Sequence, residues 1–214
     1  MDERPGFKVP VASEGWPFIL PPLALAGLLA LVGRRRSALL PAAVGLACLG
    51  FFRDPARRTP RLSGALVAPA DGQVMGLAEM EDDFVGAAAR LSIFLSPLDV
   101  HVNRSPLSAV VREVEYTPGR FVAAYRPEAS MDNERCTLSL EGDAARVRVR
   151  QIAGVVARRI VCRVRPGDKL EAGERFGMIR FGSRTDLIVP RATTWRVHLG
   201  DRVRGGETVV GMLP

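Results

Sequence analysis

The sequence contains few cysteines, and their placement argues against two common uses of cysteine. Cys48, Cys136 and Cys162 are odd in number, and none of them is spaced as in a metal-binding motif. A framework of disulfides is therefore not expected, which favours a reducing compartment, and no metal site is predicted.

Lysine and histidine are also scarce. Only Lys8 and Lys169 occur among 30 basic residues, and the two histidines are His101 and His198. Enzymes that use pyridoxal phosphate bind it through a lysine. Lys8 precedes an apolar segment and Lys169 lies in a predicted surface turn, so neither is a good candidate for that role.

Nearly all of the positive charge of the chain comes from arginine, and basic residues outnumber acidic ones, 30 to 23. The net charge is +7, and aromatic residues make up 6% of the chain. Arginine binds phosphate through two parallel hydrogen bonds, so an anionic partner is expected. No basic run is interleaved with aromatic residues, which argues against a nucleic-acid partner.

Residues 1–61 are predicted to form a membrane-associating segment. Two uncharged apolar runs, 16–33 and 37–52, are separated by three arginines and followed by four more. The second run is shorter than the roughly 20 residues that span a bilayer, and both arginine clusters favour the cytoplasmic side. A shallow helical hairpin in one leaflet is therefore favoured. A spanning hairpin and a buried soluble helix pair are the alternatives.

Residues 62–214 have the pattern of a β domain. Short apolar runs alternate with glycine and proline turns, and residues 146–150 alternate strictly between arginine and valine. The fold predicted is mainly β (α+β), a β-sandwich or barrel-sandwich-like catalytic domain that follows the apolar helical segment.

An internal repeat supports this fold. Residues 167–174 (GDKLEAGE) recur 33 positions later as residues 200–207 (GDRVRGGE). Each copy reads as a turn, a short strand and a second turn, so duplicated hairpins are expected. Such paired hairpins are similar to the two halves of biotinyl and lipoyl carrier domains.

The bond between Gly182 and Ser183 lies between the two copies. A serine hydroxyl can attack the preceding carbonyl, and elimination followed by hydrolysis converts the serine into a pyruvoyl ketone. Glycine before the serine leaves the carbonyl unshielded and tolerates a strained backbone. By itself a Gly-Ser pair is more typical of a turn, so the surrounding residues decide its interpretation.

Five segments in this order resemble phosphatidylserine decarboxylase proenzymes of the short, prokaryotic form. The resemblance extends from about Gly15 to the C-terminus. The segments are residues 68–74 (APADGQV), 95–106 (LSPLDVHVNRSP), 131–135 (MDNER), 151–160 (QIAGVVARRI) and 181–183 (FGS).

The resemblance implies a mechanism. The chain is expected to cleave itself before Ser183 into a β chain, 1–182, and an α chain, 183–214, that remain together as a heterodimer. The pyruvoyl group derived from Ser183 is the cofactor, and it forms a Schiff base with the amine of phosphatidylserine. Release of carbon dioxide then yields phosphatidylethanolamine, at the cytoplasmic face of the inner membrane.

The resemblance also assigns roles to side chains. Asp71 is expected to orient or charge-stabilise a base, and His101 to transfer the proton. Longer members carry a second histidine where this chain has Arg104. Either His101 serves both steps, or water and Arg104 share the work, which makes Arg104 a candidate supporting residue. Supporting positions are Asn133, Glu134 and Arg135, for which a buried ion pair that holds a loop is an equally good interpretation. His198 and the serines at 96 and 105 are expected to be structural.

Two other functions remain open at this stage. One is a membrane-tethered module like the biotinyl and lipoyl domains, although these present a lysine where this chain has Gly182 and Ser183. The other is a pyruvoyl decarboxylase of a soluble amino acid, which would not need the apolar segment.

Overall fold

The computed structural model describes residues 10–122, 132–154, 159–180 and 183–214. The chain forms two compact units, residues 1–56 and 57–214. The division falls within the arginine-rich stretch, slightly before the boundary expected after residue 61. Each unit is described separately below.

The first unit is a helical hairpin. It comprises the 3-10 turn η1 (Ser13–Gly15), α1 (Trp16–Leu31) and α2 (Arg35–Phe51). Gly33, with φ of 81°, lies in the connecting turn, where the left-handed conformation favours glycine. Gly45 allows the helices to pack closely, because a Cβ there would lie 2.5 Å from Leu23 Cδ2. The rings of Phe18 and Phe52 stack 5.5 Å apart at the other end of the hairpin.

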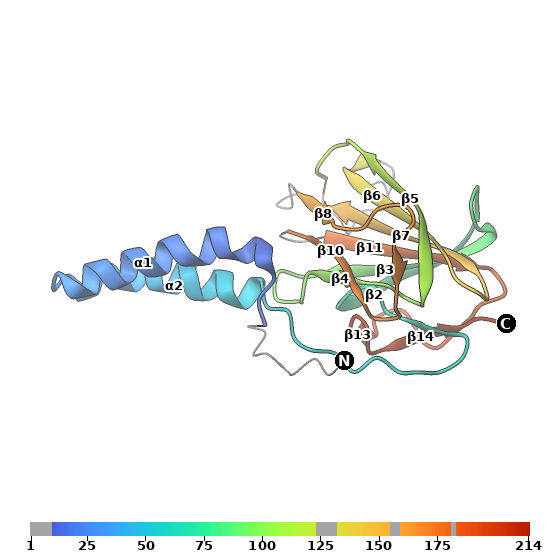
Figure 1. The fold of residues 1–214 in the computed structure, drawn as a ribbon, viewed down its shortest axis with the longest axis horizontal. Helices are drawn as coiled ribbons and strands as arrows, with labels where there is room; N and C mark the ends of the chain where they lie inside the picture. Colours follow the sequence, from blue (N-terminus) through green and yellow to red (C-terminus); the bar gives the residue numbers. More distant parts are fainter. Residues whose placement is uncertain (1–9, 123–131, 155–158, 181–182) are drawn as a thin grey trace. The chain divides into compact units, whose positions relative to one another are not determined.

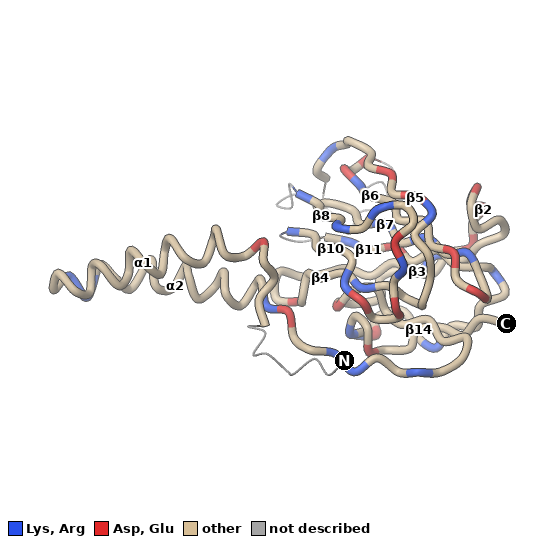
Figure 2. Tube along the Cα trace, viewed as in Figure 1, with Lys and Arg blue, Asp and Glu red and all other residues tan. Residues whose placement is uncertain are grey.

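The outer surface of this hairpin is apolar. Residues Ser13–Leu31 form a continuous helical stretch of 19 residues with a mean hydropathy of 1.4, long and apolar enough to cross a membrane. At 1.5 Å per residue it extends about 28 Å, close to the thickness of a bilayer core. Figure 2 shows that the charged residues of the helices gather at their ends. Exposed apolar side chains on the hairpin include Leu20, Leu25, Leu28, Leu31, Leu39, Leu40 and Leu46.

The second unit is built from strands, as predicted from the sequence (Figure 1). Its large sheet has eight strands in the order β13-β2-β3-β11-β7-β6-β5-β9, and two three-stranded sheets have the orders β1-β14-β12 and β4-β10-β8. The strands are β1 (Ala65–Val67), β2 (Gly72–Asp82), β3 (Gly86–Leu95), β4 (Val102–Arg104), β5 (Ala109–Thr117), β6 (Arg135–Glu141), β7 (Arg146–Ala153), β8 (Ile160–Cys162), β9 (Lys169–Leu170), β10 (Arg175–Ile179), β11 (Ser183–Pro190), β12 (Thr194–Trp195), β13 (Arg202–Val203) and β14 (Val209–Met212).

The sheet orders reveal a duplication that covers the whole β unit. Strands β1, β2 and β3 occupy positions equivalent to β4, β5 and β6, and β7 to β10 are equivalent to β11 to β14. The small sheets therefore correspond strand by strand, and the two halves of the large sheet meet where β7 pairs with β11. The repeat seen in the sequence is the β9 and β13 part of this duplication.

The two sequence repeats form turns with the same conformation. Gly167 and Gly200 have φ of 96° and 91°, while Gly173 and Gly206 have φ of 77° and 75°. The neighbouring strands are held in the same way, because Val111 and Val74 each donate a main-chain hydrogen bond to the aspartate that follows the first glycine. These bonds are 2.8 Å to Asp168 O and 2.9 Å to Asp201 O.

The core lies on one face of the central strands. Leu187 and Val189 of β11 point into the same apolar cluster as Leu91 of β3 and Val149 of β7. Because side chains alternate along a strand, Ser183 and Thr185 point to this same face. The core face of β11 is thus apolar along most of its length and becomes polar at its beginning.

Candidate active site

Ser183 is the first residue of a strand that is paired on both edges. It lies opposite Leu95 of β3 and Ala153 of β7. The residue is fully buried, and its Oγ has no hydrogen-bond partner among the described residues. An unpaired buried hydroxyl is costly in a folded protein, and among the described residues Ser183 shares this feature only with Thr193. Gly182, the other side of the predicted cleavage site, lies outside the described residues.

His101 is also fully buried, and its tautomer follows from its neighbour. Nδ1 lies 2.9 Å from the main-chain oxygen of Asp99. A carbonyl oxygen only accepts, so Nδ1 carries the proton, and the lone pair of the neutral ring is on Nε2. The main-chain oxygen of His101 accepts a hydrogen bond of 3.2 Å from Ile179, the last residue of β10. This contact ties His101 to the strand that precedes Ser183.

The loop before His101 is rigidly held. The Asp99 carboxylate accepts hydrogen bonds from the main chain and the hydroxyl of Ser96, at 2.8 and 2.7 Å, and it also pairs with Arg202. Ser96 therefore closes a turn, as expected. The hydroxyl of Ser105 also closes a turn, because it donates a hydrogen bond of 2.7 Å to Leu107 O.

Asp71 is held by groups other than the histidine. Oδ2 pairs with Arg57 at 2.7 Å, and Oδ1 accepts a hydrogen bond of 2.7 Å from the main-chain N–H of Gly205. Burial raises the pKa of the Asp71 carboxyl, while the Gly205 N–H and the charge of Arg57 act in the opposite direction. The described contacts do not join Asp71 to His101, so its role as orienter of the base stays a prediction.

The duplication explains one part of this arrangement. In the other half, Ser108 stands where Asp71 does, and its Oγ accepts a hydrogen bond of 3.1 Å from the main-chain N–H of Ala172. Ala172 and Gly205 are equivalent residues of the repeat. An acceptor at this position therefore anchors the repeated turn, and the carboxylate charge is the additional feature of Asp71.

Arg57 was not singled out from the sequence. It contacts two carboxylates, Asp71 at 2.7 Å and Glu207 at 3.1 Å, and its side chain is 8% exposed. The main-chain N–H of Arg58 also donates to Glu207, at 3.2 Å. In the sequence, Arg57 is one of several basic residues that follow an apolar segment. Only the fold shows that its side chain contacts two carboxylates of the β unit.

Arg104 is buried in the repeated turns. Its guanidinium donates a hydrogen bond of 3.0 Å to the main-chain oxygen of Gly173. Its side chain also packs against Gly206, where an added Cβ would lie 2.8 Å from Arg104 Cδ. These contacts show a structural role, and the predicted replacement of a second histidine stays a prediction.

The side chain of Asn133 makes three hydrogen bonds to the main chain, one of them to the residue that lies next to Ser183 in the sheet. Nδ2 donates to the main-chain oxygens of Val122 and Ala153, both at 2.7 Å, and Oδ1 accepts from Val122 N at 2.9 Å. Ala153 is the direct neighbour of Ser183 on β7, so Asn133 supports the strand next to the serine.

The two residues after Asn133 continue this support. The main-chain oxygen of Glu134 accepts from Ala153 N at 2.9 Å. Desolvation and the nearby Glu134 carboxylate raise the pKa of Tyr116. Arg135 begins β6 and pairs in register with Ile152.

A layer of buried amide and hydroxyl groups adjoins the serine, and the sequence did not reveal it. Asn103 Nδ2 donates to Thr185 Oγ1 at 3.0 Å, and Gln151 Nε2 donates to Asn103 Oδ1 at 2.8 Å. Gln151 falls in a segment that supports the family resemblance, but its position beside Thr185 depends on the pairing of β7 with β11.

The opposite face of β11 carries a buried ion pair. Arg184 contacts Asp186 through Nε at 2.6 Å and through Nη2 at 3.0 Å, and Nη2 also donates to Ser92 Oγ at 2.8 Å. A guanidinium held by two parallel bonds is fixed in orientation. The residue that follows Ser183 is therefore anchored by its side chain as well as by its strand.

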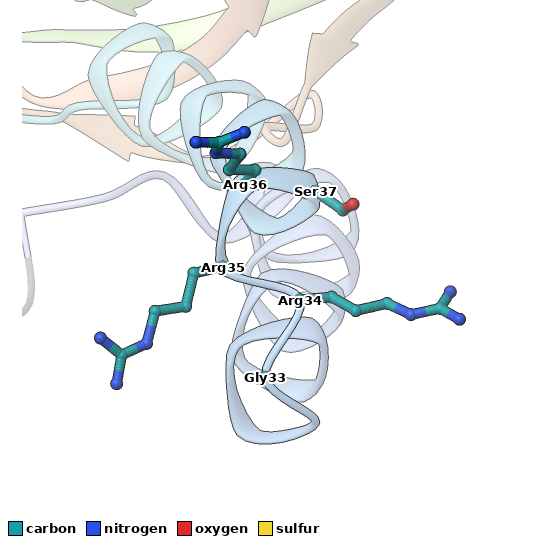
Figure 3. Close-up of a pocket in the computed structure, with 5 residues that line it drawn as sticks. All are labelled: Gly33, Arg34, Arg35, Arg36 and Ser37. Carbon is teal, nitrogen blue, oxygen red and sulfur yellow. The ribbon is translucent and has the colours of Figure 1, made fainter.

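The tip of the helical hairpin forms a separate hollow of about 450 Å³. It is lined by residues 33–37, and the side chains of Arg34 and Arg35 point in opposite directions (Figure 3). Diverging guanidinium groups do not enclose one small anion. The hollow is thus unlike a catalytic pocket, and its charge suits a surface that carries several anionic groups.

Comparisons with known proteins agree with this reading of the chain. Three similar proteins are each named phosphatidylserine decarboxylase proenzyme. They come from Symbiobacterium thermophilum (48% identical; 95% of this chain and 96% of that protein), Nitrosomonas europaea (43%; 94% of each) and Geobacter metallireducens (40%; 97% and 98%).

These similarities place the chain in a class of decarboxylases made as proenzymes. A family model described as phosphatidylserine decarboxylase matches residues 44–211. The chain belongs to the phosphatidylserine decarboxylase family. The match includes the whole β unit up to β14 and the end of α2.

The Arg57 contact leads to a pH-dependent prediction. We expect Arg57→Gln to raise the pKa of Asp71, because burial would be opposed only by the Gly205 N–H. If self-cleavage needs ionised Asp71, the acid limb of its pH profile moves to higher pH. Cleavage then slows near neutral pH and recovers in alkaline buffer. The rate is measured on denaturing gels over a pH series.

The matched controls for this prediction are Arg58→Gln and Asp71→Ser. The side chain of Arg58 is exposed and only its main chain contacts Glu207, so its profile should match the wild type. Asp71→Ser keeps an acceptor for Gly205, as Ser108 does for Ala172, and should cleave slowly at every pH. An Arg57→Gln profile that is lowered without any shift would contradict a role in ionising Asp71.

Proposed function

We propose that this protein cleaves itself before Ser183 and then decarboxylates phosphatidylserine to phosphatidylethanolamine and carbon dioxide. The observation that carries the proposal is the buried Ser183 hydroxyl without a partner at the start of β11, in a member of this family. A non-catalytic carrier-like module has no such need for an unpaired nucleophile, and the reported relatives are all named as decarboxylases.

Self-cleavage begins with Ser183 Oγ. Its oxygen bonds to the carbonyl carbon of residue 182 while the proton leaves Oγ, and the bond from that carbon to the nitrogen of Ser183 breaks as the nitrogen gains a proton. Elimination across Cα–Cβ frees the carboxylate of residue 182, and hydrolysis of the remaining enamine releases ammonia. His101 fits the proton-transfer role, because its neutral tautomer presents a lone pair on Nε2.

The residues around Ser183 fit a pyruvoyl group. The serine is buried beside a polar layer, and both neighbouring strands hold its main chain. When present, the pyruvoyl group supplies a carbonyl that condenses with a substrate amine and withdraws electrons from the bond to the carboxylate. The protein contributes water exclusion through this burial, a fixed strand end, and a histidine that holds a proton close to the strand leading to Ser183.

The helical hairpin fits a membrane-bound substrate. Its apolar surface suits insertion into lipid, and the arginines at its tip and after α2 suit anionic headgroups. We propose that the protein associates with the inner membrane at its cytoplasmic face, with the hairpin inserted shallowly.

The first test is the mass of the chain. The purified protein should separate under denaturing conditions into residues 1–182 and 183–214, and the smaller fragment should resist Edman degradation because it lacks an amino terminus. Ser183→Ala should remain whole and inactive. Ser183→Thr keeps the nucleophile and should cleave slowly. An intact wild-type chain that decarboxylates phosphatidylserine would sink the proposal.

The two chains should remain together after cleavage. Residues 183–214 supply β11 to the centre of the large sheet and β14 to the centre of a small one. Their removal would leave one edge of β3 and one edge of β7 unpaired and would open the apolar core. We expect the chains to co-elute in size-exclusion chromatography of the native protein and to separate only in denaturant. Release of the small chain in native buffer would contradict this arrangement.

Membrane binding should depend on the hairpin and not on catalysis. Deleting residues 1–52 should strongly reduce sedimentation with anionic vesicles, whereas Ser183→Ala should bind as the wild type does. A cysteine at position 35, in a chain with Cys48, Cys136 and Cys162 replaced by serine, reports the topology. Labelling from the cytoplasmic side agrees with a shallow hairpin, and labelling only from the opposite side requires a spanning one.

A further inference from the structure

Gln151 carries a buried acceptor that no described residue satisfies. The residue is 1% exposed, and its Oε1 has no hydrogen-bond partner among the described residues. Nε2 faces two acceptors, Asn103 Oδ1 at 2.8 Å and the main-chain oxygen of Val161 at 3.4 Å. Turning the amide over would place an oxygen against both, so the assignment of Oε1 follows from the contacts.

The strand register places Gln151 beside Ser183. Gln151 is directly opposite Thr185, and Ala153 is directly opposite Ser183. Gln151 is therefore the diagonal neighbour of Ser183 on the core face, a separation of about 7–8 Å that a long side chain can bridge. The main chain of β10 backs the amide, because a Cβ on Gly177 would lie 3.0 Å from Nε2.

We propose that Gln151 Oε1 accepts a hydrogen bond from the amino group of the substrate as it binds at residue 183. This inference rests on the proposed function and adds a positioning and specificity-determining residue to it. A primary ammonium has three donors and no acceptor, whereas the carboxylate and phosphate of the same headgroup only accept. Of these three groups, only the amine can satisfy Oε1.

The acceptor persists through maturation, unlike the serine hydroxyl. Cleavage removes the Ser183 Oγ–H, the one donor of that side chain, while Gln151 is unchanged. A buried acceptor without a donor is costly, so the site binds a ligand with an N–H in preference to an analogue that lacks one. Gln151 thereby selects an amine and holds it next to residue 183.

Gln151→Met tests the proposal, since methionine has a similar length and lacks the acceptor. Self-cleavage on a denaturing gel should stay within about twofold of the wild type. The half-saturating phosphatidylserine concentration in mixed micelles should rise about tenfold or more, with a smaller change in kcat. After borohydride reduction with phosphatidylserine, intact mass should show less adduct on the 183–214 fragment.

Thr185→Val is the matched control. It removes the hydroxyl that accepts from Asn103 but leaves Gln151 Oε1 in place, so half-saturation should change less than about threefold. Equal rises in both variants would overturn the proposal, because they would reflect the polar layer as a whole. Failure of a folded Gln151→Met chain to cleave would also overturn it, since Oε1 would then act on the serine hydroxyl.

A measurement on the wild type covers the case in which the variant does not fold. Phospholipids with N,N-dimethylethanolamine and choline headgroups are compared as competitive inhibitors. The dimethyl ammonium retains one N–H and the trimethyl ammonium has none, so inhibition should weaken about tenfold at the last methylation. Equal inhibition by the two lipids would reject Gln151 as an amine acceptor, whereas absence of decarboxylation altogether would reject the proposed function instead.

Discussion

The β unit depends on a strand that is hydrogen-bonded on both edges. β11 pairs without a register shift to β3 through eight residues and to β7 through six. Its main chain is fixed from its first residue, Ser183, and Leu187 and Val189 insert into the core behind it. A bond broken immediately before this strand leaves the pairing and the core intact. The position of Ser183 at the strand start therefore allows the chain to be cut without taking the sheet apart.

The duplication shows how a structural position can gain a charge. Ser108 and Asp71 anchor equivalent turns by accepting the N–H of Ala172 and Gly205. The half that contains Asp71 has an additional partner, Arg57, which pairs with Asp71 from a part of the chain outside the repeat. The geometry that holds Asp71 thus comes from the fold, while its ionisation is supported by an added arginine. Both contributions are needed to interpret a substitution at Asp71.

The sequence predicted the features that a single segment specifies. The alternation of residues 146–150 predicted a strand, and the repeated Gly-Asp turns were visible because the left-handed backbone at Gly167 and Gly200 favours glycine in both copies. The equivalence of β1–β3 with β4–β6 stayed hidden, since Asp71 and Ser108 make the same hydrogen bond with different side chains. The polar layer could not be predicted either, because Asn103, Gln151 and Thr185 are brought together only by the pairing of distant strands.

The core face of β11 changes from apolar to polar toward Ser183, and this order has an energetic reason. Leu187 lies opposite Leu91 and Val149, and the next position on that face, Thr185, lies opposite Gln151. Each buried polar atom left unpaired costs about 1–3 kcal/mol, and both Ser183 Oγ and Gln151 Oε1 are unpaired within the described chain. The core and the Arg184–Asp186 ion pair on the other face hold the strand despite this cost. Ser183 Oγ and Gln151 Oε1 belong to diagonal neighbours at the polar end of this face, where a reacting group and its ligand would use them.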